Sequence, residues 1–209
     1  MPRTVDHAER RAHISAALTR VAARTGLHAV TLRAVAAEAG VSLRLVQYYF
    51  ETKAGLVHAT LGDLERQSRR RWSGRLAGLP SPVTARAFTE AFCAEALPID
   101  EPSRAFHLLW TSYAVLAMTD PELAARPFVA GPDRLEADLA AALTAARTAG
   151  ELRPDADPAT EAARLLALSH GLGTSVLVGQ RPPEAARAVL RHHLAELFRP
   201  APTPDGTTA

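Results

Sequence analysis

Apolar residues recur three and four positions apart along most of this chain, which is the spacing of one buried face of an α-helix. Ile14, Leu18 and Val21 follow this spacing near the N-terminus, and Leu32 and Val35 open the next such stretch. No segment sustains the apolar–polar alternation typical of strands, and isoleucine, a strand-favouring residue, occurs only twice. The pattern therefore predicts an all-α fold.

Capping residues, glycine and proline predict where the helices begin and end. Asp6, Thr31, Ser42 and Thr52 are predicted N-caps, and the pair at 81–82, Ser-Pro, is predicted to open the helix that follows. All but one of the 15 prolines lie beyond residue 79, where they divide the chain into further helices. A short helical turn is expected to start at 120–121, and a disordered tail is expected at 200–209. About nine longer helices are predicted, over residues 6–26, 31–40, 42–50, 52–78, 81–97, 102–119, 132–149, 157–178 and 182–198.

The segment 31–56 carries the most information about function. Two short predicted helices flank Gly40-Val41-Ser42, a three-residue connection. Glycine suits a left-handed turn, valine can fill the corner between the helices, and serine can cap the next helix. This is the layout of a helix-turn-helix, although an ordinary helical corner with a solvated face has the same pattern.

The second helix of this pair has two unlike faces. If Val46 and Phe50 face inward, the outward face carries four side chains: Arg44, Leu45, Gln47 and Tyr48. Arginine can bond guanine, glutamine can bond adenine and leucine can contact a thymine methyl group, while Tyr48, Tyr49 and Lys53 can bond phosphates. The pattern favours a helix that reads DNA bases.

The distribution of charge supports a polyanionic partner. Residues 1–80 hold 13 Lys and Arg against 6 Asp and Glu, a formal charge of +7, and the rest of the chain holds 11 against 16, a charge of −5. The single cysteine, Cys93, excludes an internal disulfide and fits a reducing cytoplasm. Neither an apolar signal core at the N-terminus nor a membrane-spanning run is apparent, so we expect a cytoplasmic protein with no membrane partner.

Residues 12–61 resemble the DNA-binding domain of the TetR family of bacterial regulators. The resemblance rests on Thr31 at the start of the second helix, an alanine-rich helix, Ala39-Gly40-Val41-Ser42, an aromatic cluster ending in Phe50, then Thr52-Lys53 and Leu56. The family usually has tyrosine where this chain has Gln47, which implies a different base preference there.

The resemblance implies a homodimeric, ligand-responsive repressor that binds a near-palindromic double-stranded DNA operator. It divides the chain into a helix-turn-helix domain at 1–53, a long helix leading into a helical ligand-binding and dimerisation domain at 54–199, and the tail at 200–209. The predicted DNA-contacting residues are Thr31, Arg33, Ser42, Leu43, Arg44, Leu45, Gln47, Tyr48, Tyr49 and Lys53.

The same resemblance places the dimer interface on the last two helices. Apolar and small residues there supply the predicted contacts: Leu168, Leu172, Gly173, Leu190 and Leu194. A small apolar inducer is expected between helices near a stripe of aromatic side chains at residues 106–113. The predicted ligand-binding residues are Phe92, His107, Trp110, Tyr113 and His170, with an aromatic core stripe as the alternative interpretation.

No group of residues has the spacing of a catalytic, cofactor or metal site. Gly171 and Gly173 lie within an apolar helix and not after a strand, and the adjacent His192 and His193 cannot point to one metal ion. Cys93 sits in an apolar helical context typical of a small core residue. We therefore expect a protein that is not an enzyme and needs no cofactor. The alternatives are a DNA-binding regulator without a small-molecule ligand, or an all-helical carrier or enzyme.

Overall fold

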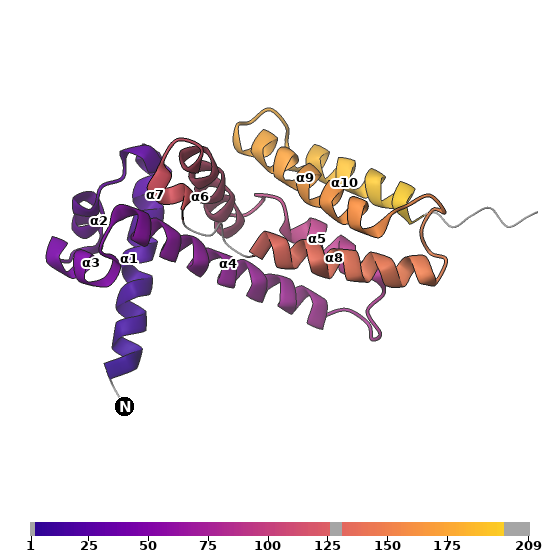
Figure 1. Ribbon diagram of the computed structural model, residues 1–209, viewed down its shortest axis with the longest axis horizontal. Helices are drawn as coiled ribbons and strands as arrows, with labels where there is room; N and C mark the ends of the chain where they lie inside the picture. The colour runs from indigo at the N-terminus through magenta and orange to yellow at the C-terminus, as the bar shows by residue number, and fades with distance from the viewer. Residues whose placement is uncertain (1–2, 126–130, 199–209) are drawn as a thin grey trace, which may run out of the picture. The chain divides into compact units, whose positions relative to one another are not determined.

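The computed structural model describes residues 3–125 and 131–198, and it is all-helical within those ranges (Figure 1). The predicted fold class is therefore confirmed. The chain forms two compact units. The first consists of Met1–Arg71 and Pro98–Ala130, and the second consists of Trp72–Leu97 and Gly131–Ala209.

The first unit holds the predicted helix-turn-helix. Its elements are α1 (Arg3–Thr25), the short 3-10 helix η1 (Leu27–Ala29), α2 (Leu32–Ala39), α3 (Leu43–Phe50), most of α4 (Lys53–Ala77), α6 (Glu101–Ala117) and α7 (Pro121–Ala124). Their apolar faces meet in one core. Its largest fully buried side chains are Ile14, Leu18, Leu56, Leu61 and Tyr113.

The turn between α2 and α3 forms as the sequence predicts. Thr31 caps α2 by accepting a hydrogen bond from the Ala34 amide, and Ser42 caps α3 by accepting one from the Leu45 amide. Gly40 ends α2 with φ 64°, a left-handed conformation that residues with a Cβ rarely adopt. The two caps and the glycine fix the start of α3 relative to α2.

The helices α6 and α7 belong to the same compact unit as the helix-turn-helix. α6 packs on α1 and η1, and its buried Leu109 and Tyr113 are part of the core that α1 to α4 share. The Tyr113 hydroxyl donates a hydrogen bond to the Leu123 carbonyl at 3.0 Å, which ties α7 to α6. The first compact unit thus extends beyond residue 53, where the predicted DNA-binding domain ends. The predicted boundary between residues 53 and 54 remains a prediction about function.

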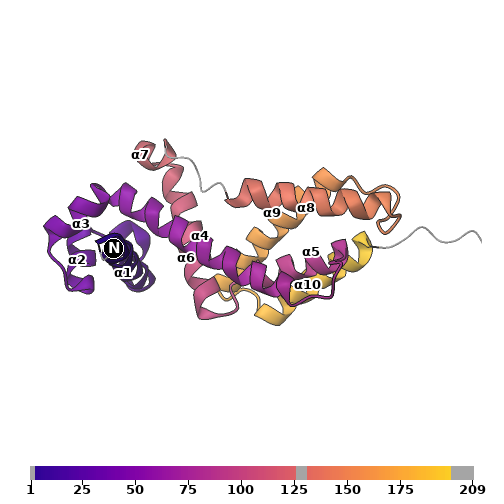
Figure 2. The ribbon, with the colours of Figure 1, turned by 90° about the horizontal axis from the view of Figure 1, so that it is seen from below.

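Among its described residues, the second unit contains the end of α4 and four complete helices. These are α5 (Ala85–Glu95), α8 (Gly131–Thr148), α9 (Pro158–Leu177) and α10 (Pro183–Leu197). α8 packs on α9, α9 on α10, α10 on α5 and α5 on α8, and the helices can be followed in Figure 2. Leucines fill the space between them: Leu139, Leu143, Leu165, Leu190 and Leu194.

A buried ionic cluster joins three segments of the second unit. The Glu161 side chain on α9 is only 2% exposed and accepts hydrogen bonds from Arg153 at 2.5 Å and from Arg164 at 3.0 Å. His193 on α10 lies 3.5 Å from the other carboxylate oxygen. A buried carboxylate needs such partners, because an unpaired charge is costly away from water. The cluster therefore fixes the loop before α9 and one face of α10 against α9.

Two predicted helix starts are wrong. α1 begins at Arg3, so Asp6 lies within the helix and does not cap it. α5 begins at Ala85 with Thr84 as its N-cap, so the Ser-Pro pair at 81–82 lies in the preceding loop. In the second case Ser81 and Thr84 are both able to cap, and Thr84 does so. In the described ranges, no helix has the length and apolar character to cross a bilayer.

Candidate nucleic-acid interface

The exposed face of α3 presents polar side chains from a helix that is otherwise anchored in the core. Val46 is fully buried and Phe50 is 5% exposed, whereas Arg44, Gln47 and Tyr48 point to solvent. Tyr48 is 72% exposed, which is unusual for so large an aromatic side chain. The predicted inward face of α3 is therefore confirmed, and so is the outward position of Arg44, Gln47 and Tyr48. Leu45, predicted to face outward, is half-buried, as is Leu43.

The predicted phosphate contacts Tyr49 and Lys53 already have partners within the protein. The Tyr49 hydroxyl lies 2.9 Å from Nδ1 of His7 in a hydrogen bond. The Lys53 ammonium donates a hydrogen bond to the His28 carbonyl at 3.0 Å. Burial lowers the pKa of Lys53, and the negative charge of Asp120 opposes that shift. An ammonium has three donors, so this hydrogen bond leaves Lys53 able to contact a phosphate as well.

Thr31, Arg33 and Ser42 lie on the surface at the starts of α2 and α3. Each of the two hydroxyl oxygens accepts a backbone hydrogen bond as a helix cap, and the Arg33 side chain is exposed. Helix N-termini present unpaired N–H groups that favour anions such as phosphate. The predicted set of DNA contacts thus stays together on the α2–α3 side of the first unit.

Two acidic residues that the sequence analysis did not select lie beside the start of α4. The Thr52 hydroxyl donates a hydrogen bond to Oε1 of Glu122 at 3.0 Å, and Asp120 acts on the charge of Lys53. Asp120 is the N-cap of α7 and Glu122 lies in its first turn, some 70 residues further along the chain. No local sequence signal predicts this contact, because it depends on tertiary packing.

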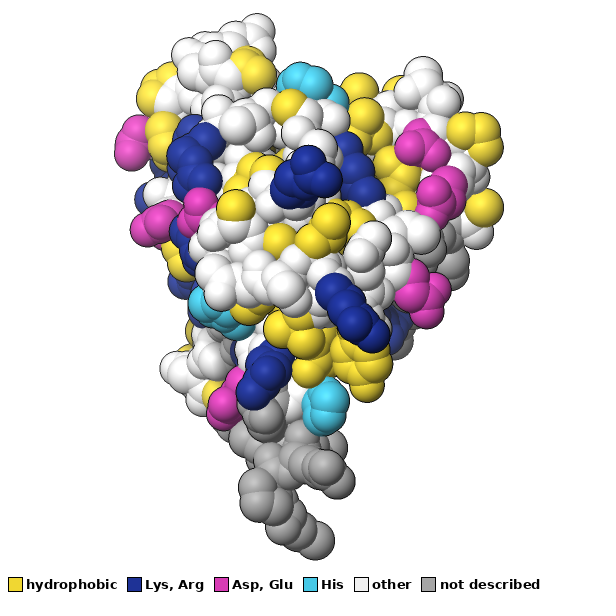
Figure 3. Space-filling model, turned by 90° about the vertical axis from the view of Figure 1, so that its left-hand side faces the viewer, with side chains coloured by type: hydrophobic (Ala, Val, Ile, Leu, Met, Phe, Trp, Pro, Cys, Tyr) yellow, Lys and Arg dark blue, Asp and Glu magenta, His cyan; other side chains and the backbone are white. Residues whose placement is uncertain are grey.

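Basic side chains lie across the face of the molecule on the α2–α3 side. In Figure 3, Lys and Arg side chains stand over the middle of this face, and most Asp and Glu side chains lie toward its margins. Apolar and neutral side chains separate the basic ones. Such a surface attracts the DNA backbone through many dispersed contacts.

α1 also contacts α3 through two side chains that were not among the predicted site residues. Arg11 donates a hydrogen bond to the Tyr49 carbonyl at 2.7 Å, and His7, one turn earlier, reaches the Tyr49 hydroxyl. His7 and Arg11 are four residues apart, which places them on one face of a helix. This spacing is the one feature of the sequence that indicates a shared role for the two side chains.

The predicted ligand-binding residues divide between the two compact units. On α6, in the first unit, Tyr113 is fully buried in the core, His107 is 7% exposed and Trp110 packs against the core as a half-buried side chain. In the second unit, Phe92 is buried on α5 and His170 is exposed on α9. Tyr113 therefore contributes to packing, while the ligand role of the set stays a prediction.

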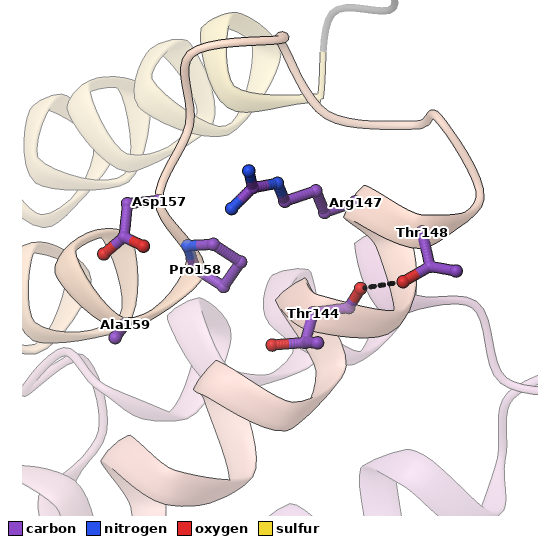
Figure 4. A pocket seen from close by; sticks show the side chains of 6 residues that line it. All are labelled: Thr144, Arg147, Thr148, Asp157, Pro158 and Ala159. Carbon is purple, nitrogen blue, oxygen red and sulfur yellow. Dashed lines mark hydrogen bonds between the residues drawn. The ribbon is translucent and has the colours of Figure 1, made fainter.

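A groove of about 530 Å³ lies at the surface of the second unit, where α8 ends and α9 begins (Figure 4). Its lining includes the exposed side chains Thr144, Arg147 and Asp157. The Asp157 carboxylate already accepts a hydrogen bond from the Thr160 amide as the cap of α9. Hydrogen bonding to the Thr160 side chain, and then to this amide, lowers the pKa of Asp157. The groove contains none of the predicted ligand-binding residues, and a separate cavity between α1 and α6 measures only about 20 Å³.

The predicted dimer contacts are mostly inside the second unit. Leu172, Leu190 and Leu194 are at most 7% exposed, Gly173 is also buried, and Leu168 is half-buried. Four of these five residues therefore pack within one chain. The side of α9 that faces solvent carries four small residues, Ala163, Ala167, Gly171 and Thr174, together with the larger Arg164 and His170.

A capped α2–turn–α3 unit, with an exposed polar face on α3 and basic side chains around it, defines a helix-turn-helix DNA-binding protein. Residues 14–60 match the model of bacterial regulatory proteins of the tetR family, and residues 85–199 match the model of the BetI-type transcriptional repressor, C-terminal. The chain belongs to the TetR family, with a C-terminal region of the BetI type. DNA-binding transcriptional regulation is the activity that the match to this family supports.

Curated relatives carry the same description over part of their length. The HTH-type transcriptional regulator BetI of Vibrio parahaemolyticus is 38% identical over 58 residues, which are 28% of this chain and 29% of that protein. BetI of Escherichia coli O127:H6 is 28% identical over 123 residues, covering 59% of this chain and 63% of that protein. The chain thus matches less than two thirds of the length of either relative.

Solved structures match over nearly the whole chain. A TetR-family regulator from Rhodococcus sp. aligns with a TM-score of 0.81 and 26% identity. The alignment covers 91% of this chain and 100% of the Rhodococcus chain. A transcriptional regulator from Saccharomonospora viridis, solved in complex with choline, aligns with a TM-score of 0.79 and 25% identity, covering 90% of this chain and 96% of that one.

Proposed function

We propose that this chain is a homodimeric repressor that binds a near-palindromic operator through α3 and releases it when a small molecule binds. One observation carries the proposal: Arg44, Gln47 and Tyr48 stand exposed on a short helix whose opposite face, at Val46 and Phe50, is anchored in the core. A rigid helix with donors on its outer face suits the major groove of DNA. The match of residues 85–199 to the BetI-type transcriptional repressors supports a repressor role.

The roles within the interface follow from side-chain chemistry. Arg44 is the candidate for bidentate bonding to guanine and Gln47 for bonding to adenine, while Lys53 is the candidate phosphate contact. Replacing Arg44 or Gln47 with alanine is expected to weaken operator binding by about 1–3 kcal/mol and to relax the preference at one base pair. Lys53→Ala is expected to weaken binding to all sequences alike.

Fluorescence anisotropy with labelled duplexes measures these effects, and Arg191→Ala is the charge-matched control because Arg191 is exposed on α10. If both Arg44→Ala and Gln47→Ala keep wild-type operator affinity, α3 is not the reading helix.

We place the dimer interface on the solvent-exposed side of α9, beside α10. Small side chains there leave room for close approach of a second copy, and an added Cβ at Gly171 meets nothing within 4 Å in the single chain. Ala167→Arg should therefore shift the protein from dimer to monomer in analytical ultracentrifugation. Ala145→Arg, at an exposed position of α8, is the control. A wild-type protein that is monomeric at micromolar concentration contradicts the dimer.

Two features support the proposal that a ligand releases the operator. One is membership of the TetR family, and the other is the stripe of aromatic side chains at residues 106–113 on α6. Choline is the first compound to test, because the Saccharomonospora viridis relative was solved with it, and aromatic faces attract quaternary ammonium groups. Small apolar compounds are the second group. A ligand that binds at a concentration 100 times its Kd raises the free energy of unfolding by about 2.7 kcal/mol, which thermal melting detects.

Trp110→Ala tests whether α6 takes part in the response. This variant should bind the operator but should no longer release it with ligand, since release reflects the difference in ligand affinity between the two conformational states. The long helix α4 is the proposed lever, because it carries Lys53 in the first unit and Trp72 in the second. If no compound shifts the melting temperature or the operator affinity, the alternative of a regulator without a small-molecule ligand is favoured.

A further inference from the structure

The C-terminal end of α3 needs support from outside the helix. α3 has only 8 residues, and the last carbonyl groups of a helix have no partners within it. The chain leaves α3 through Glu51 with φ 60° and ψ −64°, a conformation that residues other than glycine rarely adopt. The end of the reading helix therefore carries backbone strain that other contacts must offset.

Arg11 on α1 supplies such contacts. Its Nη1 atom donates a hydrogen bond of 2.7 Å to the Tyr49 carbonyl, which lies in the last turn of α3. The guanidinium carbon stands 4.6 Å from the centre of the Phe50 ring. A positive charge at this point also interacts favourably with the negative end of the α3 dipole. One side chain thus contacts the last two residues of α3 in two different ways.

His7 adds a second contact from the same side of α1. Its Nδ1 atom and the Tyr49 hydroxyl lie 2.9 Å apart, and the two rings meet edge to face with centres 5.7 Å apart. α1 therefore holds both the main chain and the side chain of Tyr49. The opposite end of α3 is fixed by its Ser42 cap, so both ends of the helix are restrained.

We propose that Arg11 is a positioning residue for DNA reading: it holds the end of α3 through Tyr49 and Phe50, so that Arg44 and Gln47 meet the base edges at the correct depth and angle. The inference rests on the proposed role of α3. Base readout depends on geometry at the scale of about 0.5 Å, whereas phosphate contacts tolerate more movement. Loss of Arg11 should therefore reduce the preference for the operator more than it reduces the affinity for DNA in general.

A direct bond from Arg11 to a DNA phosphate is the competing explanation, because Arg11 is exposed. The two explanations differ in measurable ways. A lost phosphate contact weakens specific and non-specific binding alike and lowers the salt slope by about one. Lysine would preserve most of a phosphate contact, but it lacks the planar group that both bonds the Tyr49 carbonyl and stacks on Phe50.

The experiment compares the full-length protein with Arg11→Gln and Arg11→Lys, using Arg10→Gln as the control that removes the same charge from the neighbouring position. The operator is first selected from a random pool of DNA duplexes with the wild-type protein. Affinities for this operator and for a scrambled duplex are then measured at two salt concentrations, and thermal melting checks that each variant is folded. We expect Arg11→Gln to lower operator affinity about tenfold and scrambled-duplex affinity less than about twofold, with little rescue by Arg11→Lys. Arg10→Gln should lower both affinities by similar factors.

Two results would overturn the inference. One is an equal loss on both duplexes that Arg11→Lys restores, which identifies a phosphate contact. The other is unchanged operator affinity in Arg11→Gln. The variant Arg44→Ala separates this failure from failure of the proposed function: if Arg44→Ala loses operator affinity while Arg11→Gln does not, only the positioning role is wrong. If neither variant loses affinity, α3 is not the reading helix.

Discussion

Tyr113→Phe removes one hydroxyl group and tests whether the aromatic stripe of α6 belongs to the core. Tyr113 is fully buried, and its hydroxyl donates a hydrogen bond to the Leu123 carbonyl at 3.0 Å. The phenyl ring stays in place, so the change leaves almost no cavity and its main cost is the loss of this hydrogen bond, since the Leu123 carbonyl keeps the Ala125 amide as a second donor. That cost is about 1 kcal/mol of unfolding free energy. For a chain of this size each kcal/mol lowers the melting temperature by about 2–4 °C.

Urea unfolding followed by circular dichroism measures this cost, with Tyr48→Phe as the matched control because the Tyr48 side chain is 72% exposed. The control should stay within about 0.5 kcal/mol of the wild type, as exposed substitutions usually do. If Tyr113→Phe is equally neutral, the hydroxyl does not hold α7 to α6. If it keeps stability and instead alters ligand-triggered release of DNA, Tyr113 lines a ligand site and the assignment to the core is refuted.

Three further predictions concern charge. Glu122→Gln should tighten DNA binding about two- to fivefold at low salt, since it removes a negative charge that contacts Thr52 at the start of α4; Glu101→Gln, at the other end of α6, should have no such effect in the same anisotropy assay. Cys93 should react with a thiol reagent only after unfolding, because burial raises its pKa to about 12; fast labelling of the folded protein would contradict this. Burial lowers the pKa of His193 from its usual 6.5, so the unfolded chain takes up a proton first and the free energy of unfolding should fall as the pH drops below about 6.5; His193→Gln should flatten that dependence in urea titrations.

The helices were predictable because local signals and tertiary packing agree in this chain. The hydroxyl groups of Thr31 and Ser42 can cap a helix, and Gly40 can adopt a left-handed conformation. In the folded chain Thr31 caps α2, Gly40 ends it and Ser42 caps α3. Asp6 and the serine of the pair at 81–82 failed as caps because a capping residue has only a small effect on free energy. α1 extends back to Arg3, and Thr84 caps α5 in place of that serine.

The exposed polar face of α3 was also predictable, since a helix of known start fixes which side chains point together. The supporting contacts were not. Arg11 reaches Tyr49 across 38 residues of sequence, and Glu122 reaches Thr52 across 70. Periodicity describes one helix at a time and does not say which partner a polar face will meet. The predicted dimer leucines show the same limit: a leucine stripe marks a buried face, but Leu190 and Leu194 are buried against their own chain.

Selection of bound fragments from a random pool of DNA duplexes tests the central claim most directly. If α3 of two identical chains reads DNA, the retained fragments should share a near-palindromic motif with half-sites one helical turn or a multiple of it apart. Binding to that motif should weaken steeply between about 50 and 200 mM salt, and Arg44→Ala should remove the preference at a base pair in each half-site. A pool that yields no enriched motif, or a motif without two-fold symmetry, would contradict the account.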